Sequence, residues 1–230
     1  YKVTGVQTCA LPISVSVNNV RADHEGSGYF QATAGDYDLL SAQAGVSFSA
    51  IDDILAFRVT GFTMDRDGFV SDVALGEKDA IQDRDRWGAS VQALWTPNDD
   101  VTVHVMLDKS EIDEICCGAG TWKNNFVADG VPGKAGTDVI AEDIIGATVL
   151  LGEDFYDREV ATSYLPVSQN EDQGISIQVD WHMEDYQFTS ITAYREYESF
   201  DSVDSDFMDI DGVDRTNTQD QDQFSQELRM

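Results

Sequence analysis

Two neighbouring cysteines are the residues of this sequence whose chemistry depends most directly on their spacing. Cys116 and Cys117 stand side by side in a long stretch with little hydrophobic pattern. Adjacent cysteines can form a disulfide with each other or each can pair elsewhere, and the periplasm and the cell surface permit either. A metal site would need further ligands at suitable spacing, and none lies nearby. Cys116 and Cys117 are therefore a candidate loop disulfide, and we predict no metal there.

An acidic run near the C-terminal end of the sequence could hold calcium, whose ligands in proteins are oxygen atoms. It comprises Asp204, Asp206, Asp209, Asp211 and Asp214. An EF-hand loop takes ligands from its first position and from a glutamate at its twelfth. With residues 209–212 as the middle of such a loop, position one is Phe207 and position twelve is Thr218. We therefore expect a solvated acidic loop.

Catalytic groups are hard to place. His24, His104 and His182 are scattered, and none stands beside a serine or cysteine in an arrangement that suggests a nucleophile. Residues 130–134 (Gly-Val-Pro-Gly-Lys) lack the spacing of a phosphate-binding loop. The spacing of these residues therefore reveals no catalytic, cofactor-binding or metal site.

Composition narrows the classes of partner. The 230 residues include 43 Asp and Glu but only 14 Lys and Arg, which gives a net charge of −29. Nucleic-acid binding depends on Lys and Arg that neutralise phosphates, so we exclude nucleic acid. Hydrophobic residues at 42% and aromatic residues at 10% are too many for a disordered chain. No run approaches the roughly 18 apolar residues of a membrane-spanning helix. A membrane-spanning strand needs only about 9–11 residues with every second one apolar.

The dominant pattern is an alternation with a period of two, which indicates β-strands. It is clearest over residues 86–96, where one face carries Trp87, Ala89, Val91, Ala93 and Trp95. The two tryptophans are eight residues apart, about 26 Å along an extended strand. At a tilt of roughly 40° this spans about 20 Å, close to the apolar band between the aromatic girdles of an outer-membrane barrel. We predict that Trp87 and Trp95 are membrane-girdle residues.

Seven further segments alternate in the same way. The eight predicted strands are Gly28–Ala34, Leu40–Ser49, Leu55–Thr60, Arg86–Thr96, Val101–Asp108, Ile175–His182, Tyr186–Tyr197 and Gln223–Met230. Their polar phase carries His104 and His182, which we expect to be solvated wall residues. It also carries Arg58 and Arg195, which we expect to pair with carboxylates. Outside residues 138–151 no segment has a convincing amphipathic helical pattern.

The connections between these strands alternate in length. Short turns at residues 50–53, 97–100 and 184–185 alternate with residues 35–38 and with the long stretches 64–85, 109–173 and 199–222. In an antiparallel meander, alternate connections lie at the same end of the sheet. Short turns at one end and long loops at the other are typical of outer-membrane barrels. A soluble domain rarely carries a connection of about 60 residues without pattern. The predicted fold class is therefore all-β, an antiparallel meander.

Residues 1–14 stand apart from this pattern. Residues 3–13 resemble the translation of a sequencing-adapter oligonucleotide, so we interpret residues 1–14 as an artefact and exclude them from the fold. A signal peptide would need a charged start and an apolar run of about 7–15 residues. Thr8, Cys9 and Pro12 interrupt such a run here. We expect the sequence to be truncated at both ends.

Several short motifs, in their order and spacing, resemble the TonB-dependent outer-membrane receptors. They are Gly35–Asp38, Ile54–Phe62, Asp65–Phe69, Leu94–Asp100, Thr189–Arg195 and Phe224–Arg229, the last two being the most specific. The resemblance covers about residues 15–230. It implies that residues 15–22 end a plug domain and that residues 23–230 form the first eight strands of a twenty-two-stranded transmembrane barrel. The barrel is incomplete, and a TonB box, a complete plug and a closing strand are missing from the sequence.

The resemblance also implies a function and a location. Family members bind a scarce nutrient, typically a ferric siderophore, haem, vitamin B12 or a glycan, and import it across the outer membrane of Gram-negative bacteria with energy passed through TonB. Of these ligands we expect a ferric siderophore. Because such transport involves no bond chemistry, the resemblance also implies that the protein is not an enzyme, with no catalytic residue, no cofactor and no metal. The implied partners are the TonB complex, the siderophore or a similar small ligand, and outer-membrane lipid. Aromatic residues of the long loops are candidate ligand contacts, namely Trp122, Phe126, Phe155 and Tyr156.

Two other classes of protein stay open at this point. A surface or secreted β-rich module, calcium-binding or adhesin-type, would show the same alternation of apolar and polar residues. A secreted β-rich enzyme would also do so, but it would need a convergent acid–base pair that the sequence does not reveal.

Overall fold

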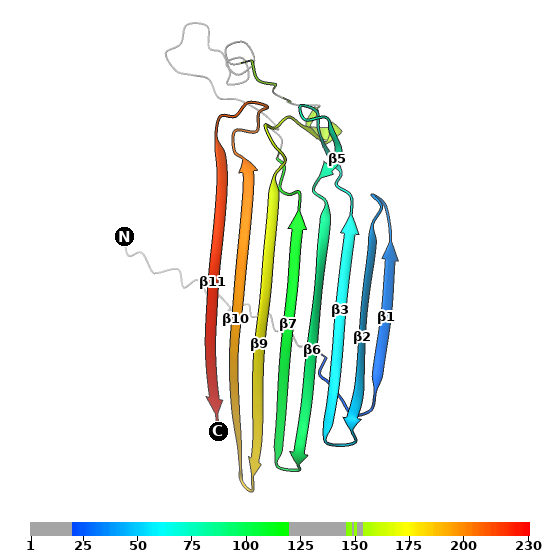
Figure 1. Cartoon of the computed structure of the whole chain (residues 1–230), viewed down its shortest axis with the longest axis vertical. Coiled ribbons are helices and arrows are strands. Elements are labelled where there is room, and N and C mark those ends of the chain that lie inside the picture. Colours follow the sequence, from blue (N-terminus) through cyan, green and yellow to red (C-terminus); the bar gives the residue numbers. More distant parts are fainter. Residues whose placement is uncertain (1–19, 120–145, 149, 151–153) are drawn as a thin grey trace, which may run out of the picture.

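One antiparallel sheet of eight strands dominates the protein (Figure 1). The computed structural model describes residues 20–119, 146–148, 150 and 154–230. The strands of the sheet are β1 (Ser27–Ala34), β2 (Leu40–Ile51), β3 (Leu55–Arg66), β6 (Arg84–Asn98), β7 (Val101–Glu114), β9 (Val167–Met183), β10 (Tyr186–Asp204) and β11 (Asp214–Arg229). They are ordered β1-β2-β3-β6-β7-β9-β10-β11. Each strand therefore pairs with the next one along the chain, apart from three short strands that lie elsewhere. The predicted all-β antiparallel meander of eight strands is confirmed.

The strands are longer than their hydrophobic alternation predicted. β9 begins at Val167, eight residues before the predicted start at Ile175. β10 and β11 stay paired as far as Asp204 and Asp214. The predicted connections 109–173 and 199–222 were therefore too long at both ends. The alternation fades because polar and charged residues occupy both faces of these extensions, while the backbone ladder continues without interruption.

The short connections lie together at one end of the sheet, as predicted (Figure 1). In the turn between β2 and β3, Asp53 has a φ of 58° and its carbonyl accepts a hydrogen bond from Thr96 Oγ1 at 2.7 Å. Between β6 and β7, Asn98 Oδ1 accepts the backbone N–H groups of residues 100 and 101, both at 3.0 Å. Aspartate and asparagine favour such turns because they tolerate positive φ and bond to nearby backbone.

A small second sheet lies at the opposite end, where the long connections are (Figure 1). It consists of β4 (Val70–Asp72), β5 (Glu77–Ile81) and β8 (Glu159–Val160). β4 pairs antiparallel with β5 and parallel with β8, so it joins two connections that are far apart in the sequence. A Cβ atom at Gly68 would collide with the backbone of residues 79–81. We call residues 67–83, 115–119 and 154–166 together the cap.

Helical structure is limited to one turn in the described residues. η2 (Asp154–Asp157) is a 3-10 turn of four residues. Most of the candidate helical segment 138–151 lies outside the described residues. Within the part of the chain that the structure describes, no helix has the length and apolar character needed to cross a membrane.

Candidate functional site

The eight-stranded sheet has an apolar face across its midsection. A single row of paired residues crosses seven strands on this face, from β2 to β11, and comprises Val46, Val59, Val91, Leu107, Ile175, Tyr194 and Phe224. Their exposed fractions lie between 39% and 67%. Exposed apolar patches of this extent are typical of surfaces that contact another protein or a membrane.

Trp87 and Trp95 both lie on the apolar face, on β6 at either side of this row. They are 41% and 48% exposed. Trp181 on β9 lies on the same face near the short-turn end and is also 48% exposed. This placement is the one that membrane-girdle residues need. Their contact with a membrane stays a prediction.

The apolar face ends abruptly toward the cap. Four residues beyond the apolar row, carboxylates from four neighbouring strands stand opposite one another: Glu111, Glu171, Glu198 and Asp220. One of them, Glu171, accepts a hydrogen bond from Lys109 Nζ at 2.5 Å. Like charges facing each other across strands are unfavourable unless water screens them. Polar and charged residues already stand two positions beyond the apolar row, where Lys109, Gln173, Glu196 and Asp222 are register partners. The acidic row therefore lies outside the apolar band, in the part of this face that water reaches.

The opposite, polar face carries an ion-pair network centred on Arg195. Its guanidinium donates to both oxygens of Asp108, at 2.8 and 2.9 Å, and to Asp172. Asp108, Gly174 and Arg195 are register partners on β7, β9 and β10, so the arginine side chain crosses a whole strand. Gly174 permits this crossing, because a Cβ there would lie 3.0–3.3 Å from three guanidinium atoms. The predicted pairing of Arg195 with carboxylates is confirmed.

Replacing Gly174 with leucine is expected to displace the guanidinium and separate Arg195 from Asp108. We expect a loss of about 1 kcal/mol in the free energy of unfolding from the ion pair, because the partly exposed pair is screened by solvent. Urea denaturation of Gly174→Leu, Arg195→Met and the double variant measures it. Since both changes remove the same interaction, the double variant should lose less than the sum of the single losses. Additive losses would show that the Arg195 side chain does not cross over Gly174 to reach Asp108.

Arg58 does not behave as predicted. It is 5% exposed on the polar face of β3, donates to Ser47 Oγ at 2.9 Å and lies 5.8 Å from the ring centre of Tyr29. No carboxylate of the described residues lies within ion-pair distance of it. The prediction that Arg58 pairs with a carboxylate was therefore wrong. The reason is its neighbours: the register partners Ser47 and Gln92 are polar but uncharged.

The two wall histidines lie on the polar face. His104 is within 3.0 Å of Gln92 Oε1, and His182 is exposed near the short turn between β9 and β10. Neither these nor His24 belongs to a group of three or more possible metal ligands among the residues that the structure describes.

The segment that precedes β1 lies against the polar face. The carbonyl of Val20 accepts a hydrogen bond from Gln92 Nε2 at 3.1 Å, and Arg21 donates to Gln178 Oε1 at 3.2 Å. Ala22 is 3% exposed. Residues 20–22 are not in a strand, and residues 15–19 of the predicted plug end lie outside the described residues, as do residues 1–14.

Two buried aspartates hold residues 162 and 163 of the cap by hydrogen bonds. Asp72 is 1% exposed, and its carboxylate accepts hydrogen bonds from the amides of residues 74 and 75 and from both the amide and the hydroxyl of Thr162. Asp204, at the end of β10, is 2% exposed and accepts the amide and hydroxyl of Ser163 at 2.9 and 3.0 Å. Two adjacent residues, Thr162 and Ser163, thus connect one loop to two distant parts of the chain.

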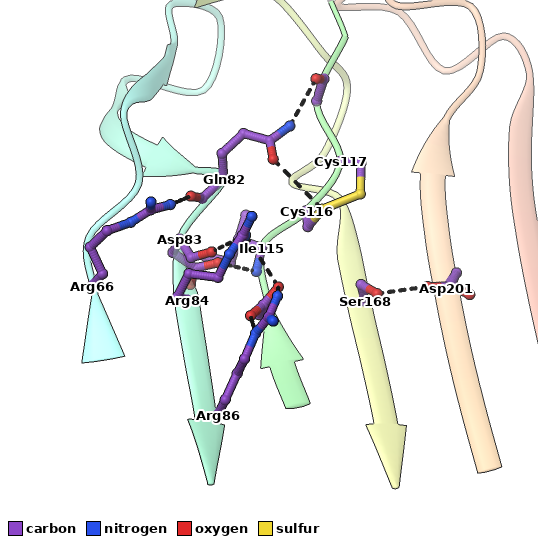
Figure 2. The surroundings of a disulfide bond; sticks show 12 residues. Arg66, Gln82, Asp83, Arg84, Arg86, Ile115, Cys116, Cys117, Ser168 and Asp201 are labelled. Carbon is purple, nitrogen blue, oxygen red and sulfur yellow. Dashed lines mark hydrogen bonds and ion pairs between the residues drawn. A yellow bond between two sulfur atoms is a disulfide. The ribbon is translucent and has the colours of Figure 1, made fainter. Parts of the chain in front are cut away.

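Cys116 and Cys117 are joined by a disulfide directly after β7 (Figure 2). Gln82 lies beside them, with its Oε1 3.7 Å from Cys116 Sγ, and donates from Nε2 to the carbonyl of Gly118 at 3.3 Å. The peptide bond between the two cysteines is cis. The disulfide therefore lies where the end of β7 meets the loop that follows β5.

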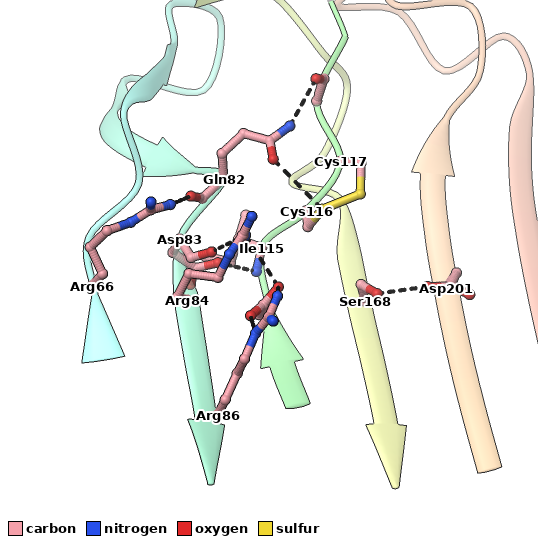
Figure 3. Close-up of polar contacts among 12 residues, drawn as sticks. Arg66, Gln82, Asp83, Arg84, Arg86, Ile115, Cys116, Cys117, Ser168 and Asp201 are labelled. Carbon is pink, nitrogen blue, oxygen red and sulfur yellow. Dashed lines mark hydrogen bonds and ion pairs between the residues drawn. A yellow bond between two sulfur atoms is a disulfide. The ribbon is translucent and has the colours of Figure 1, made fainter. Parts of the chain in front are cut away.

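Charged side chains next to the disulfide hold the end of β6 against the end of β7 (Figure 3). Arg84 and Arg86 converge on Glu114, which is 4% exposed, with contacts at 3.3 and 3.0 Å to its Oε2. The Asp83 carboxylate accepts the amide of Ile115 at 2.7 Å. Burial raises the pKa of Asp83 above its ordinary value, and this amide opposes that shift.

The candidate ligand contacts from the sequence are only partly placed. Trp122 and Phe126 lie outside the described residues. Phe155 and Tyr156 fall in η2, and Tyr156 is 68% exposed. Nothing in the described chain tests their contact with a ligand.

The sequence patterns missed a group of aromatic and arginine residues where the cap meets the ends of the first strands, with Phe69 and Arg158 in the cap and Tyr37 and Arg66 beside it. The guanidinium carbons of Arg66 and Arg158 lie 5.3 and 5.7 Å from the ring centre of Phe69, within cation–π range. Tyr37 packs against Phe69 at 5.9 Å and its hydroxyl accepts a hydrogen bond from Arg158. Arg158 is 121 residues from Tyr37, so spacing along the chain held no signal for this group.

The acidic run at residues 204–214 is organised by hydrogen bonds to its own surroundings. Asp206 accepts the amides of residues 208 and 213, and Asp209 accepts the amide and hydroxyl of Thr148 at 2.7 and 2.8 Å. In the described residues no three acids, histidines or cysteines form a group that could hold a metal ion.

Comparison with known proteins finds a solved structure with a similar fold. No family model and no curated protein matches the sequence. Among solved structures, the chain is similar to the ferric yersiniabactin uptake receptor FyuA from Yersinia pestis, with a TM-score of 0.65 and 16% sequence identity. The match covers 91% of this chain and 28% of the FyuA chain, so this chain spans little more than a quarter of that length. At this identity the likeness shows that the two share a fold.

Proposed function

We propose that residues 23–230 are the first eight wall strands of a TonB-dependent outer-membrane receptor of a Gram-negative bacterium, and that residues 15–22 end its plug domain. The observation that carries this proposal is the two-faced sheet, which has an uninterrupted apolar row on one side and Arg195 with its two aspartates on the other. A membrane wall needs such faces, because one side meets lipid and the other lines a polar interior. The likeness to FyuA over 91% of the chain supports it.

The transported ligand is proposed to be a ferric siderophore. The support is that the structural neighbour is an uptake receptor for a ferric siderophore. Binding and passage would be driven by energy delivered through the TonB complex, without any bond chemistry in the protein. The wall strands would line the passage, and the cap would face the outside of the cell.

Extraction of the native protein from membrane fractions is expected to require detergent. The apolar row would lie in the hydrocarbon region, from which salt and urea do not release a barrel. Fractionation with high salt, urea and detergent in turn, followed by immunoblotting, measures it. Release by salt or urea alone would contradict the membrane proposal. Reading the gene on both sides of this sequence supplies a second check, with a plug domain expected before residue 15 and about fourteen more strands after residue 230.

A calcium-binding surface module is not favoured by the described residues. Three of its five carboxylates, those of Asp204, Asp206 and Asp209, already accept hydrogen bonds from backbone amides or hydroxyl groups. A stabilising shift of the melting temperature on adding calcium would nevertheless revive that alternative.

A further inference from the structure

We propose that a hollow in the cap, beside Phe69, binds a small molecule that has an apolar body and one anionic group. The hollow has a volume of about 570 Å³, within the usual range of ligand sites. Carbon atoms of Phe69, Val70, Ala119 and Val160 make up much of its wall. A wall of this kind favours the apolar part of a ligand, which leaves water when it binds.

The charge of the ligand follows from two arginines. Arg158 lines the hollow, and Arg66 shares the Phe69 ring with it, each guanidinium carbon lying within 6 Å of the ring centre. In the described residues neither arginine lies within ion-pair distance of a carboxylate. Two guanidinium groups beside one ring repel each other, so an anion near them is stabilised and a further cation is not.

Both arginines keep hydrogen-bonding capacity. A guanidinium has five N–H donors. Arg158, whose side chain is exposed, donates from Nη1 to the hydroxyl of Tyr37. Arg66 donates to the carbonyl of Gln82, but its Nε is buried without a partner. Carboxylates and phosphates are the groups that guanidinium donors bind most strongly.

A single anionic group fits this hollow better than several. Glu159 also lines it, next to Arg158 in the chain. Its carboxylate would repel a second negative charge on the ligand. The amide of Gln82, another lining residue, offers a neutral polar contact.

Arg158 is held in place before any ligand arrives. Its carbonyl accepts the amide of Ser71 at 2.9 Å, which continues the parallel pairing of β4 with β8. Its φ of 60° is in the left-handed region and turns the chain out of η2 into β8. A preformed arginine loses less freedom on binding, which favours affinity.

This inference rests on the proposed function in one respect, which is that the cap faces the outside of the cell where a ligand would arrive. Within that function it names the chemical class of the ligand. The ligand is expected to present one carboxylate next to a compact apolar body.

Binding of benzoate to the full-length native protein that contains this chain, purified in detergent micelles, tests the proposal. Benzylammonium and benzyl alcohol serve as cationic and neutral probes of the same size. Ligand-observed NMR is expected to show benzoate bound more tightly than either. Arg158→Gln should weaken benzoate binding about tenfold, and Arg158→Lys should weaken it less because the charge remains. Arg215→Gln, an exposed arginine on β11 outside the hollow, is the matched control and should change nothing.

A second variant keeps the test valid if Arg158→Gln disturbs the cap. Ala119→Trp fills the hollow but leaves both arginines in place, and it should abolish benzoate binding. Equal binding of the three probes, or benzoate binding unchanged in both Arg158→Gln and Ala119→Trp, would overturn the proposal. If benzoate does not bind as expected but extraction still needs detergent, the inference about the hollow is wrong and the proposed receptor function stands. If benzoate binds as expected but salt alone releases the protein, the hollow stands and the proposed receptor function is wrong.

Discussion

Replacing Ile177 with arginine is expected to destabilise the protein by about 2–4 kcal/mol when it is folded into lipid vesicles. Ile177 lies on the apolar face of β9, with Trp181 four residues toward the short turns and the acidic Glu171 six residues toward the cap. This places it near the middle of the apolar band. A guanidinium at that depth would have to leave water for hydrocarbon, and the cost is greatest at the midplane.

The neighbouring position supplies the control, because adjacent residues of a strand point to opposite faces. Ser176 lies on the polar face, beside Met106 and Ala193 in register. Ser176→Arg should therefore change the free energy of unfolding by less than about 1 kcal/mol. Urea titration in vesicles, followed by tryptophan fluorescence, measures both variants. Equal losses for the two variants would mean that the apolar face does not meet lipid.

The apolar half of the fold could be predicted from sequence because its signal is local. Side chains alternate with a period of two, and a segment such as residues 86–96 carries that alternation in its own composition. Short turns then fix the register of β2 with β3, of β6 with β7 and of β9 with β10. Across the long connections the row from Val46 to Phe224 continues because a shift by one residue would move a strand's apolar residues to the other face. The same reasoning placed Arg195 on the polar face, and opposite charges on nearby polar-face positions made its pairing predictable.

The strand extensions and the cap could not be predicted because their signals are not local. The extension of β9 before Ile175 alternates no apolar residues, and its strand exists because β7 and β10 offer backbone partners on both sides. β8 has only two residues and pairs with a strand about 90 positions earlier. Arg58 shows a further limit: phase placed it on the polar face, but only the register reveals that its neighbours are neutral.

The cap also depends on contacts between residues far apart in the sequence, which no short motif contains. Among its buried side chains, Asp72 accepts hydrogen bonds from two separate segments. Its carboxylate is buried and takes four hydrogen bonds, two from its own turn and two from Thr162. Alanine at this position would remove the acceptor of the two amides in the exposed turn, which water can replace, and of the buried Thr162. A buried donor left without an acceptor costs about 1–3 kcal/mol. We therefore expect Asp72→Ala to lower the local stability of the cap by about 3 kcal/mol or more.

Hydrogen exchange followed by mass spectrometry measures this loss region by region. A local loss of about 3 kcal/mol corresponds to roughly 100-fold faster exchange of the affected amides. We expect it in residues 70–81 and 158–163, which the Asp72 contacts hold together. The ladder from β6 to β10 should exchange at its original rate, because its hydrogen bonds do not involve Asp72. Asp157→Ala removes an exposed carboxylate from the same loop and should leave both regions unchanged. Equally faster exchange in the cap and in the ladder from β6 to β10 would show that the two regions unfold together. The stability of the cap would then not depend on the Asp72 contacts separately from the sheet.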